Sequence, residues 1–209
     1  LEKPKTTLET GLVAYYPFNG NANDESGNGN EGDYLGSPSY VTKEDGSKFL
    51  SLDGSTGFRG HGPLTTGAPF SWSVWGKLNN IGDWLYLSMQ SGGSEWSPNV
   101  YASLEPNGTT RFFFASCCGT PYVDAYLTLE VGKWFHFVVT QNTSNERRIY
   151  VNEHEEALLE GVPYGQIVSS YLAVNHQAGR KYWKADLDDL RIYNRALSEA
   201  EVAALYELE

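Results

Sequence analysis

Side-chain oxygens are packed most densely into residues 19–33, where asparagine, aspartate, glutamate, serine and glycine follow one another closely. Ca²⁺ takes roughly six to eight oxygen ligands from carboxylates, amides and backbone carbonyls on a loop that can bend around it. The same residue types also build ordinary tight turns, so this segment alone leaves both interpretations open. The candidate calcium ligands in it are Asn19, Asn21, Asp24 and Ser26.

A second acidic cluster, at 186–189, lies in a predicted strand near the end of the chain. Because side chains alternate along a strand, we expect Asp188 to share a face with Leu190 and Ile192 and to point into the core. A buried carboxylate needs a partner. That partner is either a lysine or arginine elsewhere in the chain, or a Ca²⁺ shared with Asp24. A shared ion would tie the first turn to the last strand, so its role would be stabilising and not catalytic.

Aromatic residues in or near predicted loops are candidates for a sugar-binding surface. A flat ring offers an apolar face against which the C–H face of a sugar can pack, and nearby amide and charged groups can bind its hydroxyls. The alternative is that each aromatic residue only caps an end of the fold. The candidate ligand-binding residues are Trp84, Trp96, Tyr122, Asn175, Tyr182 and Trp183.

Two further groups, a pair of cysteines and a histidine, are also capable of chemistry. Cys117 and Cys118 are adjacent, and neighbouring α-carbons lie about 3.8 Å apart, below the usual disulfide span of about 4.4–6.8 Å. They are either two thiols on opposite faces of a strand or a strained vicinal disulfide that forms a rigid apolar bump. His136, between two phenylalanines in a predicted strand, is expected to be packed and hydrogen-bonded and not to act as a base.

Short apolar runs separated by turn signals must position these groups. Residues 70–74 alternate, so Phe70, Trp72 and Val74 should face one way and two serines the other, as in a half-buried strand. The dipeptide at 107–108, Asn-Gly, predicts a hairpin turn. Only the end looks helical, with a capping box at 198–201. This pattern predicts an all-β fold, an antiparallel β-sandwich with a short C-terminal helix.

The overall charge limits the possible partners. The formal net charge is −11, which argues against nucleic acid and anionic lipid surfaces. No apolar run approaches the roughly 18 residues of a membrane span, so we expect no membrane insertion. Neutral sugars and bound cations remain compatible with this charge.

The domain is expected over 11–207, with 1–10 a linker or a trimmed remnant, and the chain is expected to be one module of a larger parent protein.

The opening segment at 15–29 and the closing segment at 187–202 together resemble laminin-G-like, concanavalin A-like jelly-roll domains. The similarity covers roughly 11–207. The resemblance implies two packed antiparallel sheets, with a Ca²⁺ between the opening loop and the closing strand, at Asp24 and Asp188. Such domains occur in secreted or surface bacterial proteins, as sugar-binding appendages or adhesin modules, so an extracellular location is expected.

Catalysis is not expected. Glu153 and Glu155 have the spacing of a hydrolase carboxylate pair, but they follow a strand where a solvated acidic loop is expected. The segment 166–168, Gln-Ile-Val, lacks the histidine that lyases of this fold use. We therefore expect a non-catalytic carbohydrate-binding module with a structural calcium, which binds an oligo- or polysaccharide. The alternative is an adhesin module that binds a peptide or a surface protein, and a third possibility is an architectural spacer.

Overall fold

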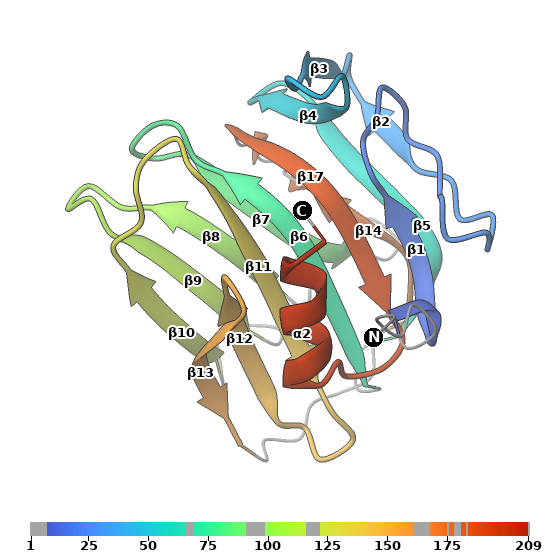
Figure 1. The fold of residues 1–209 in the computed structure, drawn as a ribbon, viewed down its shortest axis with the longest axis vertical. Coiled ribbons are helices and arrows are strands. Elements are labelled where there is room, and N and C mark those ends of the chain that lie inside the picture. Colours follow the sequence, from blue (N-terminus) through green and yellow to red (C-terminus); the bar gives the residue numbers. More distant parts are fainter. Residues whose placement is uncertain are drawn as a thin grey trace.

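Two antiparallel sheets lie face to face in the computed structural model, with one helix on the outside of the first sheet (Figure 1). The structure describes residues 8–65, 69–90, 99–115, 122–160, 168–174, 176–177, 181–182 and 184–208. This arrangement confirms the predicted β-sandwich jelly roll with a short C-terminal helix.

The first sheet has eight strands, and β17 near its centre brings the end of the chain beside its beginning, because β1 pairs with β17. In sheet order the strands are β13 (His154–Leu159), β12 (Arg147–Val151), β11 (Trp134–Gln141), β6 (Phe70–Lys77), β17 (Lys184–Tyr193), β4 (Lys48–Asp53) and β3 (Ser39–Thr42), with β1 (Leu12–Tyr16) off this path.

The second sheet has seven strands, and a short strand pair forms a third sheet of its own. In sheet order the seven are β10 (Tyr122–Leu127), β9 (Thr110–Ala115), β8 (Asn99–Leu104), β7 (Trp84–Gln90), β14 (Val168–Val174), β5 (Gly57–Thr65) and β2 (Asp33–Leu35). The separate pair is β15 (His176–Gln177) with β16 (Lys181–Tyr182).

Aromatic rings from both sheets fill the space between them. Phe112 of β9 is fully buried and lies edge-on to Phe135 and Phe137 of β11, with ring centroids 5.4 and 5.0 Å away. Such edge-to-face contacts add to the stabilisation from burial itself. The predicted hairpin is confirmed, since β8 and β9 pair around a turn in which Gly108 has a φ of +82°.

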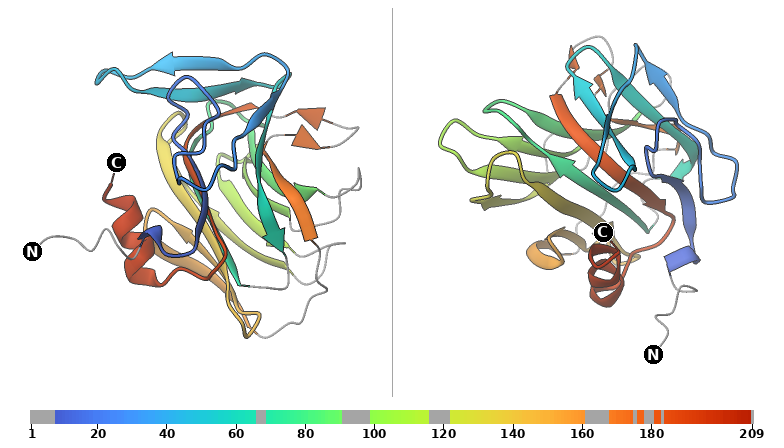
Figure 2. Two further views of the ribbon diagram at one scale, coloured as in Figure 1. Left: turned by 90° about the vertical axis from the view of Figure 1, so that its right-hand side faces the viewer. Right: turned by 45° about the horizontal axis from the view of Figure 1, so that its top comes forward.

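Helix α2 (Glu199–Tyr206) packs on the outer face of the eight-stranded sheet, and Figure 2 shows it on the outside of that sheet. Its buried residues Val202 and Leu205 join Tyr150, Tyr193 and Leu197 in a second, smaller hydrophobic cluster. No helix within the described ranges is long and apolar enough to cross a membrane.

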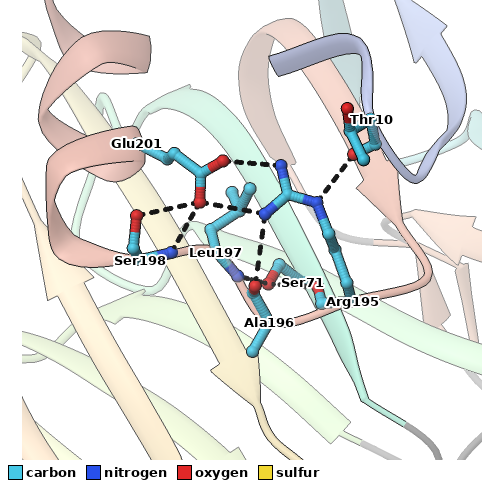
Figure 3. A network of polar contacts seen from close by, with 7 residues as sticks. All are labelled: Thr10, Ser71, Arg195, Ala196, Leu197, Ser198 and Glu201. Atoms are coloured by element: carbon cyan, nitrogen blue, oxygen red, sulfur yellow. Dashed lines mark hydrogen bonds and ion pairs between the residues drawn. The ribbon is translucent and has the colours of Figure 1, made fainter. Parts of the chain in front are cut away.

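Arg195 ties this helix to the start of the chain (Figure 3). Its guanidinium donates to both carboxylate oxygens of Glu201, at 2.9 and 2.7 Å, and to the carbonyl of Thr10 at 2.7 Å. The predicted capping box is formed, and the Ser198 backbone N–H donates to the Glu201 carboxylate at 2.9 Å. Arg195 lowers the pKa of Glu201 to about 2, with Ser198 also contributing and burial opposing.

Strand β6 differs from the prediction, because both of its faces are buried. Ser71 and Ser73 are fully covered instead of solvated. The Ser71 hydroxyl donates to the Arg195 carbonyl at 2.9 Å, and Ser73 lies 2.7 Å from His136 Nε2. The closing segment covers the face that alternation assigned to water, so a period of two identified the strand but not its environment. His136 is buried and hydrogen-bonded as expected.

Strand β17 also corrects an expectation. A β-bulge lies between Asp188 and Arg191, and Asp189 within it has a φ of +47°. The extra residue shifts the alternation, so Leu187 joins Leu190 in the main core cluster. Asp188 therefore does not share the core face with Leu190, because the strand changes phase between them.

The acidic segment after β12 also forms a different structure from the one predicted. Asn152 and Glu153 have positive φ angles of 49° and 69°, and β13 then pairs with β12. Glu155 is an exposed strand residue that accepts from Arg148 Nε at 2.9 Å, not part of a loop. A tight turn of two residues was sufficient to return the chain as an edge strand.

Candidate functional site

A row of aromatic rings crosses four neighbouring strands on the outer face of the seven-stranded sheet. We call it the aromatic ladder and define it as Trp84 of β7, Tyr101 of β8, Phe113 of β9 and Tyr122 of β10. Successive ring centroids lie 4.7, 4.7 and 5.2 Å apart, with interplanar angles of 35°, 14° and 26°. These distances match the spacing of neighbouring strands, about 4.7–4.9 Å.

Strand alternation explains why these rings gather on the outside. In β9 the buried Phe112 and Phe114 face the core, and the half-buried Phe113 between them faces outward. In β10 the buried Val123 and Ala125 are flanked by outward-facing residues in the same way. Tyr101 lies directly opposite Phe113. Trp84 and Tyr122 are each offset by two positions from their neighbour in the ladder, so these rings meet diagonally across the strands.

An ion pair lies beside the ladder. Arg111 Nη2 and Nε of β9 donate to Asp124 Oδ2 of β10 at 3.0 and 3.2 Å. The Arg111 guanidinium carbon is 4.8 Å from the Phe113 ring centroid and 5.6 Å from that of Tyr126. Both partners are about one quarter exposed, so water or a ligand reaches them. This places fixed donors and acceptors next to apolar ring surface.

The ladder's geometry determines which ring surfaces are available to a ligand. Tyr101 and Phe113 are each stacked between two neighbours, so their faces are covered from both sides. Tyr122 at the end of the ladder is 46% exposed, and Tyr126 on the same strand is 56% exposed. Burial raises the pKa of the Tyr101 phenol, which therefore stays neutral. The accessible part of the face is thus its β10 end, together with the Arg111–Asp124 pair.

The sequence identified part of this face. Trp84 and Tyr122 were predicted ligand-binding residues, and both belong to the ladder, whereas Tyr101, Phe113 and Tyr126 were missed. Phe113 could have been found from the sequence, because strand alternation turns it outward between the two buried phenylalanines Phe112 and Phe114. Tyr182 lies in β16, and nothing further is described of its side chain. Five predicted residues lie outside the described residues: Trp96, Cys117, Cys118, Asn175 and Trp183.

The opening loop is organised around Asp24. Its Oδ1 accepts from the backbone N–H groups of Tyr15 and Ser26, both at 2.9 Å. Its Oδ2 accepts from the Ser26 hydroxyl and the Asn30 N–H, both also at 2.9 Å. Burial opposes the charge, but these donors outweigh it and lower the pKa of Asp24. The four donors fill the four lone-pair positions of the carboxylate.

The other predicted loop ligands are also occupied. Asn19 Oδ1 accepts from the Lys48 N–H at 2.9 Å, and Asn21 Oδ1 accepts from the Asn23 N–H at 3.0 Å. The Ser26 hydroxyl, besides donating to Asp24, lies 3.0 Å from Asn28 Nδ2, which can donate to it. The Asn21 bond to a backbone N–H two residues on is typical of a tight turn, whereas the Asn19 bond joins the loop to the start of β4.

Asp188 forms an ion pair with Lys43 in a small cavity of about 210 Å³. Burial raises the pKa of Asp188 to about 6, despite the opposing effect of Lys43. Asn19 lines the same cavity, whereas Asp24 and Ser26 are not among its described lining residues. A basic side chain at Asp188 is one of the two alternatives that the sequence left open.

These contacts bear on the predicted calcium. Asn19, Asn21, Asp24, Ser26 and Asp188 do not form one ligand shell here, because the Asp24 oxygens are fully used and an ammonium group lies against Asp188. No group of three or more His, Cys, Asp or Glu residues arranged to hold a metal ion is found in the described parts of the chain. As placed, the residues do not fit an ion unless Lys43 moves away, and calcium binding stays a prediction.

Comparison with known proteins identifies the family. The sequence matches the family model described as the concanavalin A-like lectin/glucanases superfamily over residues 52–203, more than half of the chain. The chain belongs to this superfamily. The laminin-G-like resemblance found in the sequence is thereby confirmed. No curated protein matches the chain significantly.

Solved structures share the fold of this superfamily member. Domain 4 of AbnA, a GH43 extracellular arabinanase from Geobacillus stearothermophilus, solved with arabinotriose, is 23% identical with a TM-score of 0.69, covering 93% of this chain and 98% of that one. The binding domain of Paraclostridial Mosquitocidal Protein 1 is 19% identical with a TM-score of 0.70, covering 95% and 52%. The binding domain of Botulinum Neurotoxin DC, solved with SialylT, is 13% identical with a TM-score of 0.70, covering 96% and 52%.

The chain therefore spans about half the length of the two toxin domains and nearly all of the arabinanase domain. At these identities the likeness concerns the fold alone. A fold of this kind supports many functions, so the function has to be argued from the residues of the site.

Proposed function

We propose that this chain is a carbohydrate-binding module that holds an oligosaccharide against the β10 end of the aromatic ladder. The observation that carries the proposal is the combination of exposed Tyr122 and Tyr126 with the Arg111–Asp124 pair on one face. Aromatic surface packs against the C–H groups of a sugar ring. A guanidinium and a carboxylate side by side can donate to and accept from neighbouring hydroxyls.

The sugar is a neutral one in this proposal, because the net charge of −11 disfavours acidic polysaccharides. Arabinose oligosaccharides are the first probes to use, since one structural neighbour was solved with arabinotriose. The module acts without catalysis and outside the cell, as one part of a larger protein. Any bound calcium would stabilise the fold on the opposite sheet and would not touch the sugar.

A direct binding measurement tests the proposal. Isothermal titration of arabinotriose, followed by a panel of neutral oligosaccharides, should detect binding, and Tyr122→Ala and Tyr126→Ala should each weaken it roughly tenfold. One stacked ring contributes about 0.5–1.5 kcal/mol beyond its buried area. Together with the lost burial this approaches the roughly 1.4 kcal/mol that corresponds to tenfold in Kd. Arg111→Ala should weaken binding by a similar factor, because it removes the charged donor.

Tyr206→Ala is the matched control, since Tyr206 is a partly covered tyrosine of α2 on the other side of the sandwich. It should leave sugar affinity unchanged. Equal affinity of the Tyr122 variant and the unaltered protein would refute the assignment of the site. Absence of binding to every neutral oligosaccharide would refute the proposed function itself.

The second candidate function is binding of a peptide or a surface protein through the same face. Tyrosine, tryptophan and arginine are the residues that most often dominate protein interfaces, and the ladder together with the adjacent Arg111 presents all three types on one face. Loss of binding to a protein partner on Tyr122→Ala, with no affinity for any sugar, would favour this candidate over the first.

A further inference from the structure

A second cavity, of about 620 Å³, lies on the outer face of the eight-stranded sheet and is independent of the aromatic ladder. Residues of β1, of β17 and of the end of α2 line it. Its lining includes Arg191 and Tyr193 of β17, two positions apart on the strand, and we call this pair the floor. Ser26 and Asn28 of the opening loop also line the cavity. No part of the proposed sugar-binding face borders it among the described lining residues.

Both floor residues carry a donor without a partner. Arg191 is 8% exposed and Tyr193 is 1% exposed, yet Arg191 Nη1 and the Tyr193 hydroxyl find no hydrogen-bond partner among the described residues. Arg191 uses its other terminal nitrogen for Asp189, at 3.1 Å. Burial raises the pKa of Tyr193 to about 12, so its hydroxyl keeps its proton at neutral pH. Unpaired buried donors are rare and costly, and these two call for acceptor oxygens from a ligand.

The rest of the cavity restricts the ligand further. Its aliphatic side chains come from the start of the chain and from the C-terminal helix region: Leu8, Leu12, Leu205 and Leu208. Two exposed carboxylates, Glu9 and Glu25, also line it. The ligand therefore needs an acceptor group for the floor, an aliphatic body for the leucines, and a group that tolerates or binds negative charge.

Two simple ligand classes, a plain anion and a sugar, meet only some of these three requirements. A plain anion would meet Arg191, but Asp189 already neutralises that guanidinium and both glutamates would repel it. A sugar would find little ring surface to stack on, because Arg191 covers one face of the Tyr15 ring, with its guanidinium carbon 4.1 Å from the ring centroid, and Tyr193 is buried. A zwitterion with a branched aliphatic side chain satisfies all three requirements.

We propose that this cavity binds an aliphatic α-amino acid or a short peptide, with its carboxylate on Arg191 Nη1 and the Tyr193 hydroxyl. The ammonium group faces Glu9 and Glu25, and the aliphatic side chain packs against the leucines. Charge-assisted bonds to a carboxylate are stronger than neutral ones, and burial of a leucine-sized side chain adds hydrophobic stabilisation. The titration described next distinguishes the two possible ligands, a free amino acid and a peptide.

The test is titration of the full chain with leucine, leucyl-leucine and the doubly blocked N-acetyl-leucine amide, each to about 10 mM, which would saturate a site with a Kd near 1 mM. We expect at least one of the two zwitterions to bind and the blocked compound not to bind. Preference for leucine would assign a free amino acid, and preference for leucyl-leucine would assign a peptide. Binding of neither, or equal binding of the blocked compound, would overturn the proposal.

Tyr193→Phe is the decisive variant, because it removes one donor and keeps the ring that packs in the core. It should weaken zwitterion binding roughly fivefold, the effect of one lost hydrogen bond. The ligand-free variant should melt at an equal or higher temperature, because an unpaired hydroxyl has been removed. Tyr40→Phe, on β3 at the far edge of the sheet, is the matched control and should bind like the unaltered protein. Unchanged affinity in Tyr193→Phe would overturn the assignment of the floor.

Discussion

The buried histidine of β11 should make the protein less stable in mild acid. His136 is 1% exposed, lies 2.7 Å from Ser73 through Nε2, and stacks on Trp75 with ring centroids 5.2 Å apart. Burial lowers its pKa to about 3, with Arg191 adding to this effect and Asp189 opposing it. The folded protein therefore keeps this imidazole neutral across the range in which a free histidine takes up a proton.

The sign of the effect follows from proton linkage. The unfolded chain protonates this histidine below a pKa of about 6.5, and the folded chain does so only near 3. As the pH falls through 6.5, the unfolded state gains free energy of protonation that the folded state cannot gain, so stability decreases. At pH 5.0, about 1.5 units below the unfolded pKa, the loss amounts to about 2 kcal/mol at 1.36 kcal/mol per unit.

Replacing His136 with glutamine isolates this contribution, because glutamine has no proton to gain and can still hydrogen-bond Ser73. Urea unfolding at pH 7.5 and pH 5.0 gives the free energy of unfolding of each protein. Between the two pH values the unaltered protein should lose about 2 kcal/mol more than His136→Gln. Other titrating groups contribute equally to both proteins, so they cancel in this difference.

His154→Gln serves as the matched control, since His154 is exposed on the edge strand β13. It should lose as much stability between the two pH values as the unaltered protein does. If His136→Gln and the unaltered protein lost equal amounts, within about 0.3 kcal/mol, the reasoning would be refuted. The folded protein would then accept a proton at His136, in conflict with its burial beneath Trp75.

Three further predictions concern the rest of the fold. Replacing Glu201 with glutamine should cost about 1 kcal/mol at pH 7, a value discounted for the partial exposure of its ion pair with Arg195. Urea unfolding should show this loss shrinking as the pH falls from 4.5 toward 2. The reason is that the lowered pKa of Glu201 makes its stabilisation fully present only above that window. Phe112→Ala, in the closed core, should cost about 3–5 kcal/mol, whereas Phe113→Ala on the outer face of the same strand should cost clearly less; equal losses would contradict the assigned faces. Chelation by EDTA should lower the melting temperature if calcium binds, and Asp188→Ala should abolish that effect; an unchanged melting curve of the unaltered protein would remove calcium from the description.

Local patterns in the sequence were sufficient for the fold. Short apolar runs between turn residues identified the sandwich, the Asn-Gly dipeptide at 107–108 identified a hairpin, and the capping box at 198–201 identified the helix. These features depend on residues close to one another in the chain. A turn needs particular backbone angles and a helix needs its first amides capped, and both requirements can be read from a few neighbouring residue types.

The candidate site could be only partly predicted. Trp84 and Tyr122 are 38 positions apart in the sequence, and nothing local indicates that two strands between them supply the rings that join them into one ladder. Strand register decides this, and register depends on pairing over the whole sheet. Asp188 illustrates the same limit, since one extra residue in the bulge of β17 moved it away from the core face.

The sequence by itself determined the fold class and the family, because hydrophobic periodicity, turn residues and the opening and closing motifs are local properties of the chain. Only the tertiary structure decided which side chains meet: the four rings of the ladder, Lys43 against Asp188, and Arg191 with Tyr193 at the floor of a cavity. The physical reason is that a site forms from residues distant in the chain, and their contact depends on register, bulges and the helix covering one sheet.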